Sequence, residues 1–563
     1  MDLKDLVLSK LQDVEELKDV DILSLLSFPV DNTNGDVTLP CFTLAKTLKK
    51  SPKIIADEIK EKISSDMFEK IDSVNGYLNF YLNRKAVFDA VVKGMVSSND
   101  VASINVGQGK TVFIDFCSVN LAKYMHIGHL STTIIGNVIA NIYESIGYKV
   151  VRLNYVGDYG TPFGKMIAAY KHWGNLSDIE SKGVDAIQDL YVKFNQEVEN
   201  EPSLMDEARE WFLKIENGDP EALEIYNLFI EKSIDEVKIL CDMLGVSFDS
   251  WRGESNYNDK MKPVIDELES KGLLQTSEGA KIVDLSKDNL GICMIQKSDG
   301  ASLYATRDLS AVQDRYNTYN FDLGFYVTSV QQKLHFDRWF KVCEYLDKPY
   351  AGNLKHIAYG TYSMPTGKIG SRFGKQALVR DMLDQAISKA KDIVKDRGTK
   401  VEDIETLSKA IGVGCIVFGV IKSEKIKDSV FDLEAALNFD GETSPYMQYT
   451  HARCCSIIEK AGECDLSWTD ADLDTIDNVD TFELVKHINN FEKVVLDAAN
   501  QCEPCLISRY LLNLCSLFNK FYNSYRIIED GSVVTTRLAI VTLVKRILCK
   551  GLKLLGIEPI NRM

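Results

Sequence analysis

The stretch TVFIDFCSVNLAKYMHIGHLSTTIIGNVIANIYESIG, residues 111–147, decides the fold class. TVFIDF predicts a buried strand and LSTTIIGNVIANIYESIG predicts a helix, and His126, Gly128 and His129 lie at their junction. The unpaired N–H groups and the dipole at a helix N-terminus favour a phosphate. The stretch therefore predicts a strand, a turn and a helix, with a phosphate site at the turn.

The histidine pair is too rare a pattern to be background. With 7 histidines and 35 glycines in 563 residues, the arrangement H-x-G-H is expected by chance only about 0.005 times. Such histidines can donate hydrogen bonds to a polyphosphate, whose charge grows on the bridging oxygens as pyrophosphate leaves. Gly128 would let a nucleotide lie against the backbone without a Cβ in the way. The alternative is that the two histidines only cap the helix.

Strand-like and helical segments alternate after this stretch. KVVRLNYVG, FDLGFYVTSV and LKHIAYGTYSM are apolar, strand-like runs, and their alternation with helices predicts a doubly wound parallel sheet. A long helical stretch at about 170–285 would be an insertion between the two halves of the sheet. The first hundred residues combine helices with a type I′ hairpin at Asn75-Gly76.

These patterns divide the chain into four parts, because single cores rarely exceed roughly 250–300 residues. An α+β domain spans 1–105 and ends in the polar stretch SSNDVASINVGQGK. A Rossmann-type α/β domain with the helical insertion spans 106–380. Apolar positions at three- and four-residue spacing then predict a helical connector at 381–440 and an all-helical domain at 441–563.

Charge and hydropathy restrict the environment of the chain. No apolar run approaches the roughly 18 residues needed to cross a bilayer, and the N-terminus has no secretory pattern, so we expect a cytoplasmic protein without a membrane partner. The net charge of -17 argues against indiscriminate binding of nucleic acid, and no DNA partner is expected. Residues 464–500 carry nine acids and two lysines, whereas 501–563 carry nine Lys or Arg and four acids.

Thirteen cysteines are scattered from Cys41 to Cys549, mostly inside apolar runs. This placement favours reduced core thiols over a disulfide framework. Cys502 and Cys505 have metal-ligand spacing, but no second pair lies at ribbon or finger distance. Structural cysteines are therefore favoured over zinc, and no metal site is expected.

The motif HIGH after a strand resembles the signature of class I aminoacyl-tRNA synthetases, and its surroundings resemble the arginyl-tRNA synthetase family. Five further segments resemble that family in order: GDVTLPCFTLAKTL (35–48), KSDGASLYATRDLSA (297–311), QQKLHF (331–336), SPYMQYTHARCCSI (444–457) and ISRYLLNLCSLFNKFYNSYR (507–526). The resemblance implies a class I catalytic domain, a tRNA-contacting N-terminal domain and a helical anticodon-binding domain. It also implies that L-arginine and ATP give arginyl-adenylate and pyrophosphate, and that the arginyl group passes to the 3′-terminal ribose of tRNA(Arg).

A pocket for arginine needs carboxylates and amide oxygens, because the guanidinium is planar and always charged. The resemblance implies that Asp115 and Asn120 hold the α-amino group and nearby polar atoms. It places Tyr304, Asp308 and Gln332 along the side-chain pocket, with Asp308 facing the guanidinium. Tyr304 and Asp308 are four residues apart and would share one face of a helix.

Each of these residues has an ordinary alternative. Asp115 can simply end a strand, Tyr304 can belong to the core, and Asp308 can pair with Arg307 or Arg315 on the surface. The glycine-punctuated loop VGDYGTPFG (156–164) would lie beside the active site by resemblance, whereas Asp158 within it fits a structural turn equally well.

The second class I signature, K-M-S-K-S, is altered to GKIGSRFGK at 367–375, where Ser371 replaces the second lysine. The resemblance implies that Lys123, just upstream of HIGH, supplies the missing cation together with Lys368 and Arg372. Val119 and Ser131 also depart from the family pattern, which usually has Pro and often Arg there. The implied catalytic residues are Lys123, His126, His129, Lys368 and Arg372, and the implied ATP-binding residues are His126, Gly128, His129, Lys368 and His335.

The partners follow from the same resemblance. Mg²⁺ should accompany ATP, tRNA is expected to be needed for the first step, and the enzyme is expected to be a monomer. Tyr522 and Tyr525 in the basic C-terminal region are candidates for stacking on RNA bases, although core packing is the alternative. Two rival hypotheses remain: a class I synthetase for another amino acid, and a non-catalytic synthetase-like sensor of tRNA or arginine.

Overall fold

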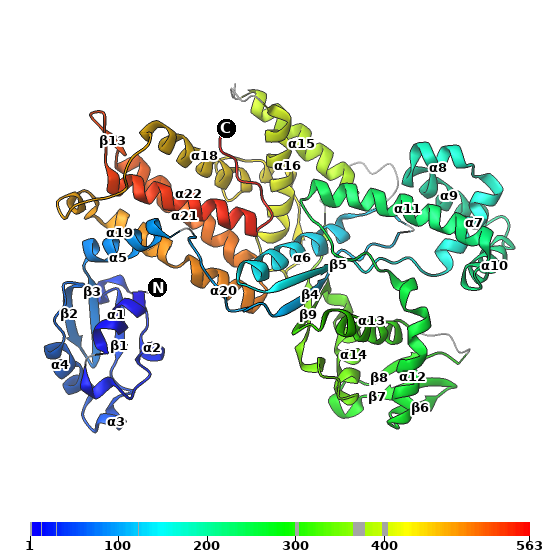
Figure 1. The fold of residues 1–563 in the computed structure, drawn as a ribbon, viewed down its shortest axis with the longest axis horizontal. Coiled ribbons are helices and arrows are strands. Elements are labelled where there is room, and N and C mark those ends of the chain that lie inside the picture. Colours follow the sequence, from blue (N-terminus) through cyan, green and yellow to red (C-terminus); the bar gives the residue numbers. More distant parts are fainter. Residues whose placement is uncertain are drawn as a thin grey trace.

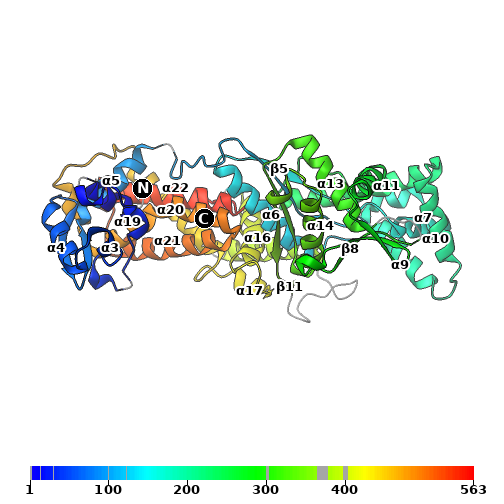
Figure 2. The ribbon, with the colours of Figure 1, turned by 90° about the horizontal axis from the view of Figure 1, so that it is seen from below.

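A four-stranded parallel sheet organises the centre of the computed structural model, which describes residues 3–12, 14–29, 31–98, 100–121, 123–298, 303–363, 378–396 and 403–563. The molecule is elongated, with the N-terminal unit at one end and a helical insertion at the other (Figures 1 and 2). The C-terminal helices lie between the N-terminal unit and the sheet (Figure 1).

The N-terminal unit is a three-stranded antiparallel sheet covered by helices. The strands β2 and β3 meet at a two-residue turn in which Asn75 and Gly76 have φ of 52° and 85°, as the predicted type I′ hairpin requires. Ser51 caps the helix after it by accepting from the N–H of Ile54. The elements are α1 (Leu3–Leu11), α2 (Ile22–Leu25), β1 (Val37–Pro40), α3 (Ala45–Leu48), α4 (Pro52–Lys62), β2 (Phe68–Val74), β3 (Tyr77–Leu82) and α5 (Arg84–Ser97).

The central sheet has the order β10-β9-β4-β5, and all its pairs are parallel, as predicted. Its strands are β4 (Thr111–Asp115), β5 (Lys149–Leu153), β9 (Leu323–Ser329) and β10 (Leu354–Tyr359). Because β4 connects to β5 on one side and β9 to β10 on the other, the direction of winding reverses between β4 and β9. In open α/β sheets, ligands bind beyond the carboxyl ends of the strands at such a reversal.

Alternate side chains of β4 face two different cores. Val112 and Ile114 point into the core shared with α6 (Ile127–Ser145) and the C-terminal helices, whereas Phe113 points into a core shared with α13 (Tyr304–Tyr319) and α14 (Lys333–Tyr345). This alternation follows from the two-residue period of a strand. Helix α6 approaches closely at Gly136, where a Cβ would lie 2.3 Å from the Phe116 ring.

The insertion between β5 and β9 is helical only in its first part. Helices cover it as far as Ser270, but the segment expected to be helical to about 285 already forms the strands β6 and β7 of a small antiparallel sheet, β6-β7-β8. The elements are α7 (Thr161–Trp173), α8 (Leu176–Lys182), α9 (Val184–Glu197), α10 (Leu204–Glu216), α11 (Pro220–Met243), α12 (Met261–Ser270), β6 (Leu274–Ser277), β7 (Ala280–Asp284) and β8 (Ile292–Gln296).

The remainder of the described chain is helical, as predicted, apart from short two-residue strands. The elements are β11 (Tyr362–Ser363), α15 (Val379–Asp396), α16 (Ile404–Ile421), β12 (Ser429–Val430), α17 (Leu433–Ala436), α18 (Ser444–Ala461), α19 (Val479–Asn489), α20 (Phe491–Gln501), α21 (Cys505–Ser524), β13 (Ile528–Glu529), β14 (Ser532–Val533) and α22 (Thr535–Leu554).

Helix α16 corrects the expectation that no segment is long and apolar enough to cross a membrane. By length and composition it passes that test, with a mean hydropathy of 1.7 over 18 residues, and it is the one helix to do so among the residues that the structure describes. Glu405 and Lys409 near its start interrupt the apolar run, but the mean over the 18 residues still passes the test. The fold buries 72% of the helix, and a helix that is apolar all round is typical of a protein core.

Polar contacts fix the N-terminal unit against the C-terminal helices. Lys85 of α5 forms an ion pair with Asp474 in the acidic region, and Trp468 Nε1 donates to Asp89 at 2.9 Å. Arg546 of α22 donates to the backbone carbonyls of Met95, Val96 and Ser98 at the end of α5. Part of the acidic region therefore serves as a contact surface within the molecule.

All thirteen cysteines are free thiols, and ten of them are buried. Cys502 ends α20 in a left-handed conformation and Cys505 begins α21, so both belong to the turn between two packed helices. Burial raises the pKa of the Cys505 thiol to about 11. Among the described residues, no group of three or more His, Cys, Asp or Glu side chains is placed to hold a metal ion.

Candidate active site

A pocket of about 400 Å³ opens at the carboxyl ends of β4 and β9, where the winding of the sheet reverses. Its size lies within the range of small-molecule sites, roughly 300–1,000 Å³. All five residues predicted for arginine line it, as does His335, which was predicted for ATP. The complete lining is Asp115, Ser118, Asn120, Tyr155, Gly157, Glu254, Tyr304, Arg307, Asp308, Tyr326, Thr328, Gln332, His335 and Phe336.

The predicted residues come from four separate segments. Asp115 ends β4 and is buried, whereas Asn120 lies in the following turn and pairs with the strand-like residue Gly157. Tyr304 and Asp308 lie on the first turn of α13, and Tyr304 is 68% exposed at the rim. Tyr304 is therefore not part of the core.

Asp308 pairs with a residue that the sequence had suggested for ATP. Its Oδ2 lies 2.7 Å from Nε2 of His335. Neither of the two arginines considered as its partners is used in this way: Arg315 pairs with Asp115 at 2.7 Å and Arg307 pairs with Glu254 at 3.1 Å. His335 thus lies in the same pocket as the predicted arginine ligands.

Glu254 is a pocket residue that sequence reasoning missed. It lies in the 3₁₀ turn Glu254–Lys260, in the irregular segment WRGESNYN, where no periodicity links it to the sheet. Burial raises the pKa of Glu254 to about 7, although the charge of Arg307 opposes the shift. The preceding Gly253 allows the close approach of this segment, because a Cβ there would lie 2.4 Å from the Asp158 carboxylate.

The loop VGDYGTPFG lies beside the pocket, and Asp158 in it is structural. Its buried carboxylate accepts from the N–H and the Oγ–H of Ser255 at 2.8 and 2.7 Å. Gly157 lines the pocket, and a Cβ there would lie 3.2 Å from Cα of Asn120. The loop therefore holds two segments of the pocket wall together.

The two histidines of the HIGH motif cap α6 and stack on each other. The N–H of Gly128 donates to Nδ1 of His126 at 3.1 Å, and the N–H of His126 donates to Nδ1 of His129 at 3.2 Å. Their ring centroids are 3.9 Å apart. A Cβ on Gly128 would lie 3.0 Å from the His126 ring, so a larger residue there would require this ring to shift by a few tenths of an ångström.

The capping contacts assign the ring protons. Because Nδ1 of each ring accepts a hydrogen bond, each neutral imidazole carries its proton on Nε2. Burial lowers the pKa of His126, and burial together with the charges of His126 and Lys123 lowers the pKa of His129 to about 3. Both rings are thus neutral at pH 7, and each has one Nε2–H donor. Capping and donation to a phosphate are therefore compatible.

The cations predicted beside the histidines are described only in part. Lys123 is exposed in the turn before HIGH, and its charge acts on both histidine rings. Lys368 and Arg372 lie outside the described residues. The described chain resumes at Leu378, and the next residue lies beside the HIGH motif: the N–H of Val379 donates to the carbonyl of Met125 at 3.0 Å.

Comparison with known families agrees with this geometry. Residues 91–433 match the family described as tRNA synthetases class I (R), catalytic domain, residues 447–563 match the DALR anticodon binding domain, and residues 1–82 match the arginyl tRNA synthetase N terminal domain. The fold and the site are therefore those of a class I aminoacyl-tRNA synthetase.

Relatives over the full length specify the family. The chain is 42% identical to an arginine–tRNA ligase of Alkaliphilus metalliredigens over 553 residues, which are 98% of this chain and 97% of the relative. It is 39% identical to an arginine–tRNA ligase of Clostridium perfringens over 566 residues, with both chains fully covered. The chain belongs to the arginyl-tRNA synthetase family.

Solved structures show the same architecture. The arginyl-tRNA synthetase of Thermus thermophilus superposes with a TM-score of 0.79 at 25% identity, with 100% of each chain covered. That of Plasmodium falciparum superposes with a TM-score of 0.80 at 22% identity, covering 100% of this chain and 98% of the other, which shows the common fold.

Proposed function

We propose that the pocket beyond β4 and β9 binds L-arginine and that His126 and His129 contact the triphosphate of ATP. The chain is an arginine–tRNA ligase, as its family membership establishes. The observation that carries the site proposal is that all five residues predicted for arginine line one pocket at the carboxyl edge of the sheet that also presents the HIGH turn. No comparison supports the alternative of a non-catalytic sensor.

The pocket residues would orient arginine by its two charged ends. Asp308 would accept from the guanidinium, and Tyr304 and Gln332 would border the same part of the pocket. Asp115 and Asn120 would hold the α-amino group. The α-carboxylate is then directed at the α-phosphate of ATP, so that a carboxylate oxygen forms the new bond to phosphorus and the bond to the β-phosphate breaks.

The histidines would stabilise the leaving pyrophosphate. Their neutral rings keep Nε2–H directed away from the capping contacts, and donors placed in advance need no rearrangement as charge develops. Lys123, Lys368 and Arg372 would add positive charge on the same side. In the second step, a ribose hydroxyl of the tRNA attacks the arginyl carbonyl and AMP leaves.

We infer that Mg²⁺ enters with ATP, because Mg²⁺ commonly binds phosphate oxygens and keeps several waters. Among the described residues, no group of three or more His, Cys, Asp or Glu side chains could hold the ion without ATP. We also propose that the enzyme is a monomer in the cytoplasm, where reduced thiols such as its thirteen cysteines persist.

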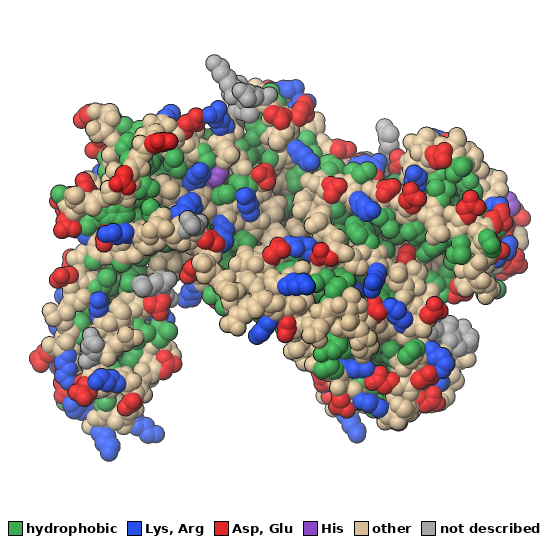
Figure 3. All heavy atoms as spheres, in the orientation of Figure 1, with side chains coloured by type: hydrophobic (Ala, Val, Ile, Leu, Met, Phe, Trp, Pro, Cys, Tyr) green, Lys and Arg blue, Asp and Glu red, His purple; other side chains and the backbone are tan. Residues whose placement is uncertain are grey.

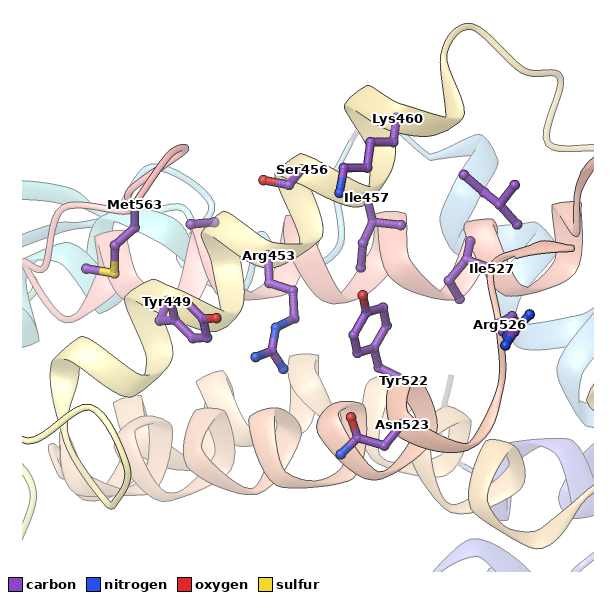
Figure 4. Close-up of a pocket in the computed structure, with 12 residues that line it drawn as sticks. Tyr449, Arg453, Ser456, Ile457, Lys460, Tyr522, Asn523, Arg526, Ile527 and Met563 are labelled. Atoms are coloured by element: carbon purple, nitrogen blue, oxygen red, sulfur yellow. The ribbon is translucent and has the colours of Figure 1, made fainter. Parts of the chain in front are cut away.

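The C-terminal helices offer a site for tRNA(Arg). A pocket of about 630 Å³ lies between α18 and the end of α21, where Tyr449, Arg453 and Tyr522 face one another (Figure 4). The guanidinium of Arg453 lies 4.8 Å from the Tyr449 ring centroid and 5.5 Å from that of Tyr522. Aromatic and guanidinium faces of this kind stack on unpaired bases. We propose that the pocket receives anticodon bases.

Tyr522 and Tyr525 differ in this respect. Tyr522 is 37% exposed and lines the pocket, whereas Tyr525 packs against Phe521 and beneath Arg537. We therefore propose RNA contact for Tyr522 and core packing for Tyr525. The N-terminal unit and the β6-β7-β8 lobe project to the same side with an open hollow between them (Figure 3), which leaves room for a bound tRNA.

We retain the domain division at 1–105, 106–380, 381–440 and 441–563 as a proposal. The family matches at 1–82 and 447–563 support the first and the last part, whereas the match at 91–433 spans both middle parts. The connector contains α15 and α16, which pack on each other. Expressing residues 441–563 alone and measuring cooperative unfolding would test the last boundary.

Charging of a tRNA(Arg) transcript with labelled L-arginine tests the site proposal. Asp308→Asn should raise the KM for arginine more than the KM for ATP, because it removes the carboxylate that faces the guanidinium. The control is Asp314→Asn, on the same helix but outside the pocket, where the carboxylate pairs with Lys260. Equal effects of the two changes would contradict the assignment of the pocket.

A further inference from the structure

The Asp115 carboxylate is held on two sides inside the protein. Nη2 of Arg315 lies 2.7 Å from Oδ2 of Asp115, and the two side chains are 5% and 6% exposed. The Oγ–H of Ser118 donates to the other oxygen at 3.2 Å. An ionised carboxylate can accept about four hydrogen bonds. Among the described residues, Arg315 and Ser118 are the side chains that donate to this carboxylate, which leaves two acceptor positions of Asp115 for a ligand in the pocket.

Arg315 lies behind the wall of the pocket. Its guanidinium carbon is 5.3 Å from the ring centroids of Phe113, Tyr155 and Tyr326. Tyr155 and Tyr326 line the pocket, whereas Arg315 does not. Three rings and one carboxylate thus fix the guanidinium in place, and Asp115 is the pocket residue with which Arg315 forms an ion pair.

The carboxylates at the two ends of the pocket have different partner groups. Asp115 faces a permanent, fully buried cation, whereas Asp308 faces the imidazole of His335. A guanidinium binds best to a carboxylate that can offer both oxygens. Because Arg315 already occupies one oxygen of Asp115, that carboxylate suits the compact α-ammonium group better than a second forked guanidinium.

We propose that Arg315 is a positioning residue that holds Asp115 for the α-amino group of arginine and so fixes the direction in which arginine enters the pocket. The inference rests on the proposed role of Asp115. Burial raises the pKa of Asp115, and the charge of Arg315 opposes this shift, so the ion pair helps Asp115 to stay an acceptor. The guanidinium of the substrate is thereby left to Asp308.

An analogue that lacks the α-amino group tests the inference. The measurements are the KM for L-arginine and the inhibition constant of 5-guanidinopentanoate, which keeps the guanidinium and the carboxylate, in ATP–pyrophosphate exchange with tRNA. Arg315→Met should raise the KM for arginine about ten- to a hundredfold, the range for a hydrogen bond to a charged group. The inhibition constant of the analogue should change less than about twofold, because the analogue has no group for Asp115.

Four further variants separate the possible causes. Arg315→Lys keeps the charge but has a single donor group, and an intermediate KM is expected. Asp115→Asn should raise the KM for arginine, and adding Arg315→Met to it should cause little further change. Arg338→Met removes a half-buried arginine that donates to the Leu290 carbonyl outside the pocket, and it should leave both constants unchanged.

The outcomes distinguish this inference from the site assignment. If Arg315→Met raises both constants equally, Arg315 only maintains the shape of the pocket and the inference is wrong. If Asp115→Asn changes neither constant, Asp115 does not hold the α-amino group and the proposed function of that residue fails first. If Arg315→Met does not fold, Arg315→Lys with a wild-type KM still overturns the inference.

Discussion

His126 caps α6 with one ring nitrogen, and we propose that it contacts ATP with the other, so substitution can separate the two roles. Nδ1 accepts the N–H of Gly128 at the start of α6, whereas Nε2 carries the proton that we assign to the phosphate of ATP. Asparagine is a good N-cap residue, and its side-chain oxygen can replace Nδ1. His126→Asn should therefore keep the cap and lose the Nε2–H donor.

The two effects have different sizes. Loss of an N-cap costs about 1 kcal/mol, so His126→Ala should lower the free energy of unfolding by that amount, and His126→Asn by less than about 0.5 kcal/mol. Loss of one donor to a developing negative charge costs about 2.7–4 kcal/mol, or 10²–10³ in kcat. Both variants should therefore lose activity alike but differ in stability.

Urea unfolding and ATP–pyrophosphate exchange with L-arginine and tRNA measure the two quantities. His126→Gln is the converse variant, because its longer amide can reach the position of Nε2 and should recover part of the exchange rate. If His126→Asn exchanges at the wild-type rate, the histidine only caps the helix and the phosphate role is wrong. If His126→Asn is as unstable as His126→Ala, the capping argument fails.

Three other predictions follow from the same structure. The pKa of His129 is about 3 in the fold and about 6.5 in an unfolded chain, so unfolding takes up a proton between these pH values. The free energy of unfolding should therefore fall as the pH drops below 6.5, by up to about 1.4 kcal/mol per pH unit. Urea titrations at pH 7 and 5 should show a smaller difference for His129→Asn than for the wild type. Lys123→Ala should lower tRNA-dependent exchange by about 10², and an unchanged rate would mean that the predicted loop at 367–375 supplies enough charge. Arg546→Met removes the hydrogen bonds to the carbonyls at the end of α5 and should lower the free energy of unfolding by about 2–4 kcal/mol. Arg562→Met, which loses an exposed pair with a glutamate, should lower it by less than about 0.5 kcal/mol, and equal unfolding midpoints of the two variants would refute the role of Arg546 in holding α5.

The sheet and the helices were predictable because their patterns are local. The apolar runs around Phe113 and Val327 have the length of a strand. The type I′ turn requires a left-handed backbone at two residues, and Asn75 and Gly76 both tolerate it. The strands at 274–284 were missed because Gln275, Thr276 and Ser277 are polar and exposed on a small sheet. Nothing in such a segment distinguishes an exposed strand from the end of a helical insertion.

Pocket residues that lie next to a strand or a motif could be predicted from the sequence. Pocket residues that only tertiary contacts bring to the site could not. The resemblance indicated Asp115 and Asp308, and spacing added that Tyr304 and Asp308 share one face of a helix. Glu254 enters the pocket from an irregular turn, and His335 lies next to Asp308 because α13 and α14 pack together. Such pairings join residues that are tens of positions apart, and no local pattern encodes them.

The hydrogen bonds of the helix cap explain why the two histidines of the HIGH motif lie only three residues apart. Each ring accepts a capping hydrogen bond with one nitrogen and, in the proposed function, presents the other to ATP, and the two rings lie against each other within one helical turn, with a glycine between them. A side chain at Gly128 would push the His126 ring away from the N–H groups that orient it. The geometry of the cap therefore sets the geometry of the phosphate donors, and changes at Gly128 should disturb stability and activity together.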